Sequence, residues 1–360
     1  MKKPPILIAG GGIAGLAASL ALAKTGQASL ILEQAIQFEA VGQGLQLGPN
    51  AVRALQALNA WDAVEPFTSS PPEIHIRDGV SGRILKRLKL GMCFEQRYGA
   101  PYRVAHRADL HAALLECTRD RSEINLRNSA TVAGFEEHDN RFTVKLKNAG
   151  IVEGASLIAA DGVNSTIRQI VFPGSVAIDC GETYHRSLVA LPKAVDAIAF
   201  DCVNLWLCPG AHVVHYPVGQ MPKLNLVAIT PKNQSIANAF EICAPSLQQL
   251  LSHAHTWSRW PGLYVNPLPS WQSGRIALIG DAAHGTLPYL AQGAAMALED
   301  AAALSAADSR IVRTTRLHQQ TLRAGHLYHA TGARRAMQNY ALRAAPSRVL
   351  LQSLDWIYKK

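Results

Sequence analysis

The chain has 360 residues, 48% of them hydrophobic and 17% charged, and a formal net charge of +9. This balance excludes a disordered chain and a small disulfide-stapled domain, and it suffices for one large hydrophobic core or two fused ones. The six cysteines show neither C-x-x-C nor a His-paired spacing, so we expect reduced thiols in a cytoplasmic protein and no metal site.

The N-terminal residues predict a strand–helix–strand unit. A buried strand over residues 5–9 leads directly into the pattern G-x-G-x-x-G, followed by a helix to about residue 24 and a second strand over 28–32. Two lysines before an apolar run imitate a signal peptide, but the second strand completes a fold unit that cleavage would destroy. We therefore expect a folded domain here and no contact with a membrane.

This unit has the residues of a dinucleotide-binding turn. Gly10 would make the tight turn, Gly12 would let the backbone approach a pyrophosphate, and Gly15 would let the helix pack on the strand. Glu33, at the end of the second strand, would accept hydrogen bonds from an adenosine ribose. Two further residues of the turn, Ile13 and Ala14, are predicted to contact the same ligand.

The middle of the chain alternates between α and β patterns. Helices are expected at residues 49–58, 108–118, 163–168 and 245–254. Strands are expected within 73–90, within 126–146 with a turn at 139–140, over 155–160, and through a β-rich region over 180–230. The chain is therefore predicted to be α/β, with an inserted β-rich region.

Near the C-terminus a second ligand-binding pattern follows a strand over residues 275–279. Gly280-Asp281 ends this strand, and an Ala-rich helix starts at Gly293 after a short loop. A carboxylate can bind the hydroxyls of a polyol, and a helix N-terminus offers free amides and partial positive charge to an anion. A reduced flavin presents both groups, its ribityl hydroxyls and a negative ring edge, so the pattern favours FAD as the dinucleotide.

From about residue 310 the chain is expected to be helical to its end. Residues 310–360 contain ten Lys or Arg and one acid, Asp355, which accounts for the whole net charge. Because the arginines are dispersed among Leu, Ala, His and Gln, we interpret them as solvated helix faces or the contact of a homodimer. A nucleic-acid partner is not expected.

Three ordered motifs resemble those of a known family, the class A FAD-dependent aromatic hydroxylases. They are GGGIAG at residues 10–15, ADGVNSTIR at 160–168 and GDAAH…LP…QGA at 280–294, supported by GLQLGPNAVRAL and YRVAHRADLHAAL. The resemblance covers essentially the whole chain and is closest to salicylate hydroxylase and 3-hydroxybenzoate 6-hydroxylase.

The resemblance implies a Rossmann-like FAD-binding domain of the p-hydroxybenzoate hydroxylase type, with an inserted β-rich substrate domain and C-terminal helices. The FAD-binding domain would be discontinuous, over 1–72, 101–172 and 270–302. The substrate domain would span 73–100 and 173–269, and a helical segment 303–360.

The resemblance also assigns further residues to the FAD site. Arg107 would reach back to the cofactor from the start of its helix, and Arg53 has a weaker claim of the same kind. Asp161 belongs to an Asp-Gly motif linked to FAD and nicotinamide binding. The C-terminal motif would add Gly280, Asp281, Pro288, Gly293 and Ala294, with Asp281 on the ribityl chain and the last two presenting amides to the flavin ring.

The activity implied is hydroxylation of a phenolic aromatic acid with NADH or NADPH and dioxygen, through a C4a-hydroperoxyflavin. His212 and Tyr216 share one face of a strand by the period of two, while His215 faces the other side. His212 matches a family histidine that helps activate the substrate hydroxyl, and histidine titrates near neutral pH. Gln292 would make a second polar contact to the substrate, and Tyr216 would line the pocket or donate its hydroxyl.

Two other functions remain open from the sequence. One is a flavin oxidase or dehydrogenase that inserts no oxygen. The other is a non-catalytic flavin-binding paralogue, suggested by Gly285, where many relatives have proline, and by a short segment around 303–311. A nucleotide-binding module without flavin is a more distant possibility, because Gly280-Asp281 would then have no purpose.

Overall fold

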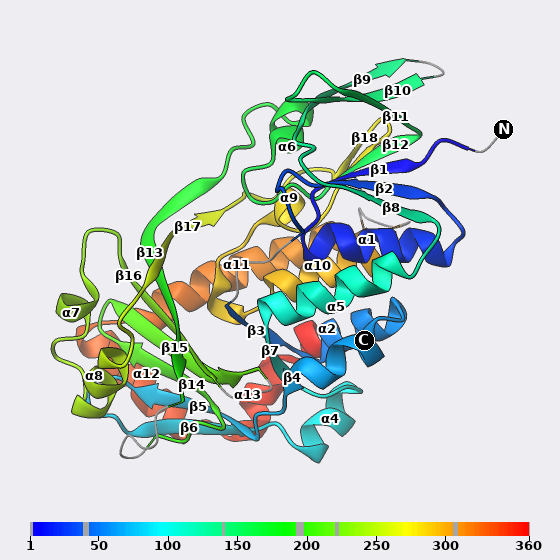
Figure 1. Cartoon of the computed structure of the whole chain (residues 1–360). Coiled ribbons are helices and arrows are strands. Elements are labelled where there is room, and N and C mark those ends of the chain that lie inside the picture. The colour runs from blue at the N-terminus through cyan, green and yellow to red at the C-terminus, as the bar shows by residue number, and fades with distance from the viewer. Residues whose placement is uncertain are drawn as a thin grey trace.

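The structure is a computed structural model, and it describes residues 3–38, 43–138, 141–191, 198–219, 223–304 and 309–359. Two large sheets organise the described chain, with the six-stranded sheet at the upper right of Figure 1 and the seven-stranded sheet at the lower left. The six-stranded sheet has the order β18 (Gln272–Ser273), β19 (Ile276–Leu278), β12 (Ser156–Ala159), β1 (Ile6–Ala9), β2 (Ser29–Leu32) and β8 (Ile124–Arg127).

The six-stranded sheet is buried on both faces because its central strands are apolar throughout. Ile8 and Ile31 pack against helices, whereas Leu7 and Leu32 pack on the opposite face against a three-stranded sheet. That sheet consists of β9 (Val132–His138), β10 (Arg141–Leu146) and β11 (Ile151–Gly154). The helices of the other face include α1 (Ile13–Lys24), α2 (Pro49–Ala57), α5 (Arg107–Arg119) and α10 (Gly293–Ala302).

The glycine turn between β1 and α1 depends on very close backbone approach. A Cβ on Gly15 would lie 1.9 Å from the carbonyl oxygen of Gly10, and a Cβ on Gly10 would lie 2.4 Å from that of Ala160. Gly10 also has φ +106°, a conformation that side chains disfavour. The turn expected from the sequence is therefore present, with glycine required at both positions.

The seven-stranded sheet carries the other half of the molecule. Its order is β17 (Ser258–Tyr264), β13 (Ile178–Ala190), β16 (Lys223–Pro231), β15 (Ala211–Val218), β14 (Val203–Cys208), β5 (Glu73–Asp78) and β6 (Ile84–Lys89). One face packs against α7 (Ile236–Ala239) and α8 (Pro245–Ser252) through a core that includes Trp206 and Val213. All seven strands fall within the predicted substrate-domain segments 73–100 and 173–269.

Short elements connect the two sheets. A small sheet joins β3 (Gly44–Leu47), β7 (Arg103–His106) and β4 (Thr68–Ser69). The remaining helices before the C-terminal region are α3 (Trp61–Val64), η1 (Glu65–Phe67), α4 (Met92–Tyr98), α6 (Thr166–Val171), α9 (Asp281–His284) and η2 (Pro288–Leu290). The helix expected over 163–168 begins later, at Thr166, because Ser165 caps it by accepting from the N–H of Arg168. The turn expected at 139–140 lies outside the described residues.

The C-terminal region is helical as expected, but its arginines are more than solvated helix faces. It consists of α11 (Ile311–Tyr328), α12 (Gly332–Ala344), α13 (Ser347–Ser353) and α14 (Asp355–Tyr358). Arg310 and Arg313 both pair with Glu299 of α10, and Arg335 pairs with Asp78 of β5. These ion pairs fasten the region to both halves of the molecule. Among the described helices, none has the length and apolar character needed to cross a membrane.

We expect Glu299→Gln to destabilise the protein. The side chain of Glu299 is 14% exposed and accepts hydrogen bonds from Asn50, Arg310 and Arg313. Neutralising it removes the counter-charge of Arg313 and leaves the buried Arg310 with Asp300 alone. The free energy of unfolding should fall by about 3 kcal/mol, visible as a lower melting temperature. Glu116→Gln, which removes an exposed pair with Arg119, is the matched control and should leave the melting temperature nearly unchanged. Equal effects of the two variants would contradict this role for Glu299.

Candidate active site

One cavity of about 610 Å³ connects the two halves of the molecule. Its walls come from the turn after β1, from β3, from the start of α5, from the cavity-facing side of β15 and β16, and from the loop between α9 and α10. The cavity therefore begins at the carboxyl end of the parallel strands, where α/β sheets bind dinucleotides. It extends to the face of β15 that carries His212 and Tyr216.

The turn after β1 forms a cradle without side chains. A Cβ on Gly12 would meet nothing within 4 Å and would project into the cavity that this residue lines. Glu33 closes the turn by accepting from the N–H of Gly11 (2.6 Å) and that of Ala35 (2.8 Å). Ile13 and Ala14 also line the cavity.

Three residues of the cavity wall hold buried polar atoms that have no partner among the described residues. They are Asp161 Oδ1, Thr286 Oγ1 and Arg186 Nε. Buried polar atoms are normally hydrogen-bonded, and an exception calls for a ligand or a similar explanation. The second oxygen of Asp161 is already engaged, because it caps α6 by accepting from the N–H of Thr166 (2.9 Å). These atoms and the open cradle at Gly12 fit a polar dinucleotide such as FAD.

Asp281 and Arg107 place opposite charges on the cavity wall. Asp281 is exposed to the cavity but surrounded by protein, and this burial raises the pKa of its carboxyl group although Arg107 and His284 oppose the rise. Burial lowers the pKa of the Arg107 guanidinium, while Asp281 counteracts that effect. A carboxylate at this position can bind hydroxyls, and the arginine can bind a phosphate or a ring oxygen.

The loop after α9 brings a helix N-terminus to the same cavity. Pro288, Gly293 and Ala294 line it, and α10 starts at Gly293. A Cβ on Gly293 would meet nothing within 4 Å, so the chain is open to the cavity where this helix starts. Amides at a helix N-terminus attract negative charge.

His212 faces the cavity from β15 and is 1% exposed. Its Nδ1 lies 2.7 Å from Nε2 of His329, and its ring is 5.4 Å from the ring of Tyr289 and 5.3 Å from that of Tyr328. Burial, and in addition the neighbouring His329, lower the pKa of His212 well below its ordinary value. The imidazole is therefore neutral near neutral pH and can accept a proton.

Tyr216 and Arg186 complete the cavity near His212. Burial raises the pKa of the Tyr216 phenol, so its hydroxyl stays protonated and can donate. Arg186 of β13 donates to Oε1 of Gln43 (2.6 Å), and burial lowers the pKa of its guanidinium. Arg186 was not among the residues predicted from the sequence, because it lies in a β-rich region without a motif. The one signal in the sequence was a positive charge within a segment that reads as a strand.

Four predicted site residues do not line the cavity: Arg53, Gln292, Gly15 and Gly280. Arg53 donates instead to the backbone carbonyls of Tyr98 and Tyr358, and neither of these residues lines the cavity. The Gln292 side chain is 2% exposed, and its Oε1 accepts from Nδ2 of Asn50 (2.9 Å). We therefore leave Arg53 and Gln292 out of the proposed site.

Two predicted glycines contribute only through the backbone. Gly15 allows the contact with Gly10 described above, and Gly280, with φ +58°, donates its N–H to Oδ2 of Asp300 (3.0 Å). Neither lines the cavity. Nε2 of His284 lies 2.5 Å from the same oxygen of Asp300.

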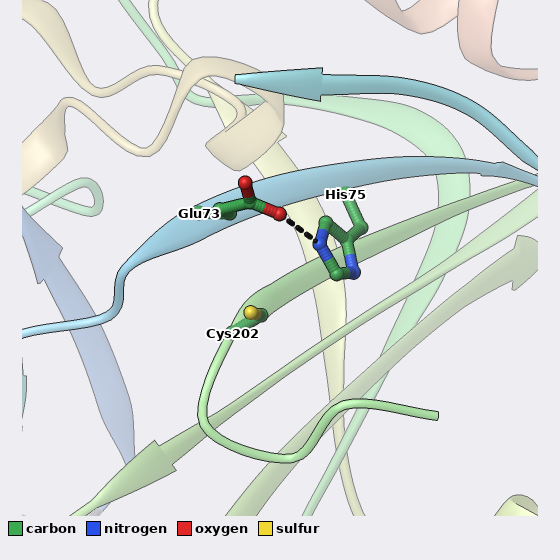
Figure 2. Close-up of side chains that lie close together, drawn as sticks. All are labelled: Glu73, His75 and Cys202. Atoms are coloured by element: carbon green, nitrogen blue, oxygen red, sulfur yellow. Dashed lines mark hydrogen bonds and ion pairs between the residues drawn. The ribbon is translucent and has the colours of Figure 1, made fainter. Parts of the chain in front are cut away.

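A separate group of potential metal ligands lies away from the cavity. Figure 2 shows Glu73 and His75 of β5 beside Cys202, with ligand atoms within 4.8 Å of one another. The strand register places His75 on the sheet face of His215, which is opposite to that of His212. Glu73 and His75 are already bonded to each other at 2.7 Å. This bond accounts for their proximity without a metal, and the group has no part in the site described here.

Comparisons with known proteins agree with this geometry. Residues 3–186 and 230–327 match the family of FAD binding domains. The chain is 32% identical over 382 residues to 3-hydroxybenzoate 6-hydroxylase of Polaromonas naphthalenivorans (strain CJ2), covering 98% of this chain and 95% of the relative. It is 31% identical to 6-hydroxynicotinate 3-monooxygenase of Bordetella bronchiseptica, covering 99% and 92%.

Solved structures share the fold. The complex of Klebsiella pneumoniae HpxO with FAD and uric acid superposes with a TM-score of 0.87 at 23% identity, covering 97% of this chain and 95% of that one. A salicylate hydroxylase substrate complex gives 0.82 at 22% identity, covering 99% and 95%. The predicted fold, an FAD-binding domain with a β-rich domain and C-terminal helices, is confirmed. The chain thus binds FAD and belongs to the FAD-dependent aromatic hydroxylases, a family of flavoprotein monooxygenases.

Proposed function

We propose that the protein hydroxylates a phenolic aromatic acid with NADH or NADPH and dioxygen, using His212 as the base for the phenol. The observation that carries this proposal is that His212, buried and neutral, faces the same cavity as the FAD-binding turn. FAD, once reduced by the nicotinamide, supplies the dioxygen chemistry. The protein must bind the ring, remove the phenolic proton and exclude water.

The residues of the first half of the cavity would hold FAD. Gly10, Gly12 and Glu33, which line the cavity together with Ile13 and Ala14, would contact its ADP part. Asp281 would bind the ribityl hydroxyls, and Arg107 the phosphates or the ring. The remaining contacts would come from Asp161, Pro288, Gly293 and Ala294. The unpartnered oxygen of Asp161 supports its assignment.

The second half of the cavity suits a ring that carries a hydroxyl and a carboxylate. His212 would take the phenolic proton, and the hydroxyl of Tyr216 would donate to the resulting oxygen. Arg186 would bind the carboxylate, because its buried Nε has no partner among the described residues. Val214 and Ile229 provide apolar wall for the ring.

The main experiment measures oxidation of NADH and of NADPH by the FAD-loaded protein, with and without hydroxybenzoates and hydroxypyridine acids, and identifies the products by mass. Stimulated oxidation with a product heavier by one oxygen atom supports the proposal. A flavoprotein that no compound stimulates would favour the oxidase or non-catalytic alternative. A homodimer and a cytoplasmic location stay predictions, which light scattering and fractionation of the producing cells would test.

We expect Gly12→Val to abolish FAD binding without unfolding the protein. Nothing lies within 4 Å of a Cβ at this position, so the new side chain would occupy only the space proposed for the pyrophosphate. The purified variant should be colourless, with a circular dichroism spectrum like that of the wild-type apoprotein. Gly91→Val, at an exposed position with equally open surroundings, should retain FAD. A yellow Gly12→Val protein would refute the assigned cradle.

We expect His212→Gln to lower the rate of product formation by about 100-fold. Glutamine preserves a polar side chain but cannot accept the phenolic proton. FAD content and the Kd for the substrate should change little, which separates a lost base from a lost site. His253→Gln, at an exposed position on the seven-stranded sheet's helical cover, serves as control. Unchanged kcat in His212→Gln would remove this histidine from the mechanism.

We expect Arg186→Met to raise the Kd for a hydroxybenzoate by about 10- to 100-fold, because a charge-assisted hydrogen bond would be lost. A phenol without the carboxylate should bind the variant and the wild type equally well. Titration of each ligand by quenching of the flavin fluorescence measures both constants. If the two ligands lose affinity equally, Arg186 shapes the cavity and does not recognise the carboxylate.

A further inference from the structure

We propose that His329, held by the carboxylate of Glu182, takes the phenolic proton on from His212, an inference that rests on the proposed role of His212 as base. The three side chains come from distant parts of the chain. His212 lies on β15, Glu182 on β13, and His329 follows directly after α11. They form an unbroken hydrogen-bonded row that starts at the cavity.

Two short contacts define this row. Nδ1 of His212 lies 2.7 Å from Nε2 of His329, and Nδ1 of His329 lies 3.0 Å from Oε1 of Glu182. The hydroxyl of Tyr289 donates to the other carboxylate oxygen of Glu182. Tyr328 also packs against His212, and the thiol of Cys180 lies 3.7 Å from Glu182. Glu182 is thus the anionic member of this set.

The carboxylate determines where the protons sit. Burial alone would raise the pKa of Glu182, but its bonds from His329 and Tyr289 hold that pKa below its ordinary value. An ionised Glu182 requires the proton of His329 on Nδ1, which leaves Nε2 of His329 as an acceptor. His212 must then carry its proton on Nδ1, so its Nε2 is unprotonated and available to the cavity.

The proton transfer follows from these tautomers. The O–H bond of the phenol breaks as an N–H bond forms at Nε2 of His212. The Nδ1–H bond of His212 breaks as an N–H bond forms at Nε2 of His329. The products are a phenolate, a neutral His212 and a His329 imidazolium beside Glu182, and no electron is transferred. The same steps in reverse return the proton from His329 through His212 to the phenolate oxygen.

His329 is better placed than His212 to hold the positive charge. Its side chain is 15% exposed, whereas His212 is 1% exposed. It caps the C-terminus of α11, an 18-residue helix whose dipole favours a cation at this end. The adjacent carboxylate adds to that preference. The site can therefore form a phenolate without a buried imidazolium in the cavity.

The test compares FAD-loaded wild type with His329→Gln and Glu182→Gln, with 3-hydroxybenzoate and the other hydroxybenzoates as probes. Two readouts are taken besides turnover at neutral pH. One is the pH at which the bound phenol ionises, followed by phenolate absorption, and the other is the dependence of turnover on pH. His326→Gln is the matched control, an exposed histidine one turn earlier on the same helix.

We expect both row variants to raise the apparent pKa of the bound phenol by about one unit or more and to lower kcat about 10- to 100-fold at neutral pH. FAD content and the Kd of the probe should stay near the wild-type values, and turnover should recover at high pH, where the phenol ionises unaided. A merely structural role would lower activity at every pH.

The outcomes separate the two proposals. If the wild type hydroxylates a probe but both row variants titrate like His326→Gln, the relay is refuted and the proposed function stands. If the wild type neither ionises nor hydroxylates any probe, the proposed function fails and the relay fails with it. If His329→Gln does not bind FAD, the relay is judged from Glu182→Gln alone. The amide oxygen of this variant can still accept a hydrogen bond from His329, but it lacks the negative charge that determines the tautomers.

Discussion

The buried carboxylate of Asp300 is the interaction on which the geometry of the site depends. It is 0% exposed and receives the N–H of Gly280 (3.0 Å), Nε2 of His284 (2.5 Å) and Nε of Arg310 (3.1 Å). Burial alone would raise the pKa of Asp300, but these partners hold it below its ordinary value. Burial alone would lower the pKa of His284, but the carboxylate of Asp300 outweighs that effect and raises it. Each shift favours the charged form, so Asp300 and His284 attract each other as an ion pair. Asp300 thereby holds Gly280 before α9 and His284 at its end, and the helix between them carries Asp281 at the cavity.

The neighbouring acid on α10 has a different task. Asp300 points toward the flavin loop, whereas Glu299 binds Arg310, Arg313 and Asn50. One helix thus fixes the loop that contacts FAD and also anchors α11. His329, the proposed proton acceptor, follows directly after α11. Its position therefore depends on α10, which anchors α11 and whose N-terminus lines the proposed flavin site. The C-terminal helices are for this reason part of the active-site structure.

The sequence predicted best those features that consist of neighbouring residues with a defined backbone. The G-x-G-x-x-G turn and Gly280-Asp281 need only a local chain path, and the strand period correctly separated His212 from His215. The sequence could not predict partners that meet only in the folded state, such as Arg186, Asp300 and the row of Glu182 and His329. Apart from the positive charge of Arg186 within a β-rich segment, their local pattern is that of ordinary surface or core residues.

Arg53 and Gln292, the two predicted side chains that do not line the cavity, show what a motif leaves undetermined. A motif fixes the position of Gln292 at the start of α10, but the direction of its side chain depends on Asn50 of α2. Arg53 likewise occupies a helix near the cavity, yet the free carbonyls of Tyr98 and Tyr358 lie within its reach and satisfy its guanidinium. In both cases a competing hydrogen-bond partner, absent from the motif, decides the orientation.

Gly285, the departure from the family pattern, has a local packing reason. A Cβ there would lie 2.9 Å from Cγ2 of Val163 and 3.3 Å from Cγ2 of Val265, and the Gly285 N–H donates to the carbonyl of Asp281 (3.2 Å). Proline would lose that hydrogen bond and crowd both valines. Glycine therefore lets the loop pack tightly behind Asp281 instead of loosening it. The non-catalytic alternative loses one of its two grounds, because the substitution preserves the position of the residue expected to bind the ribityl chain.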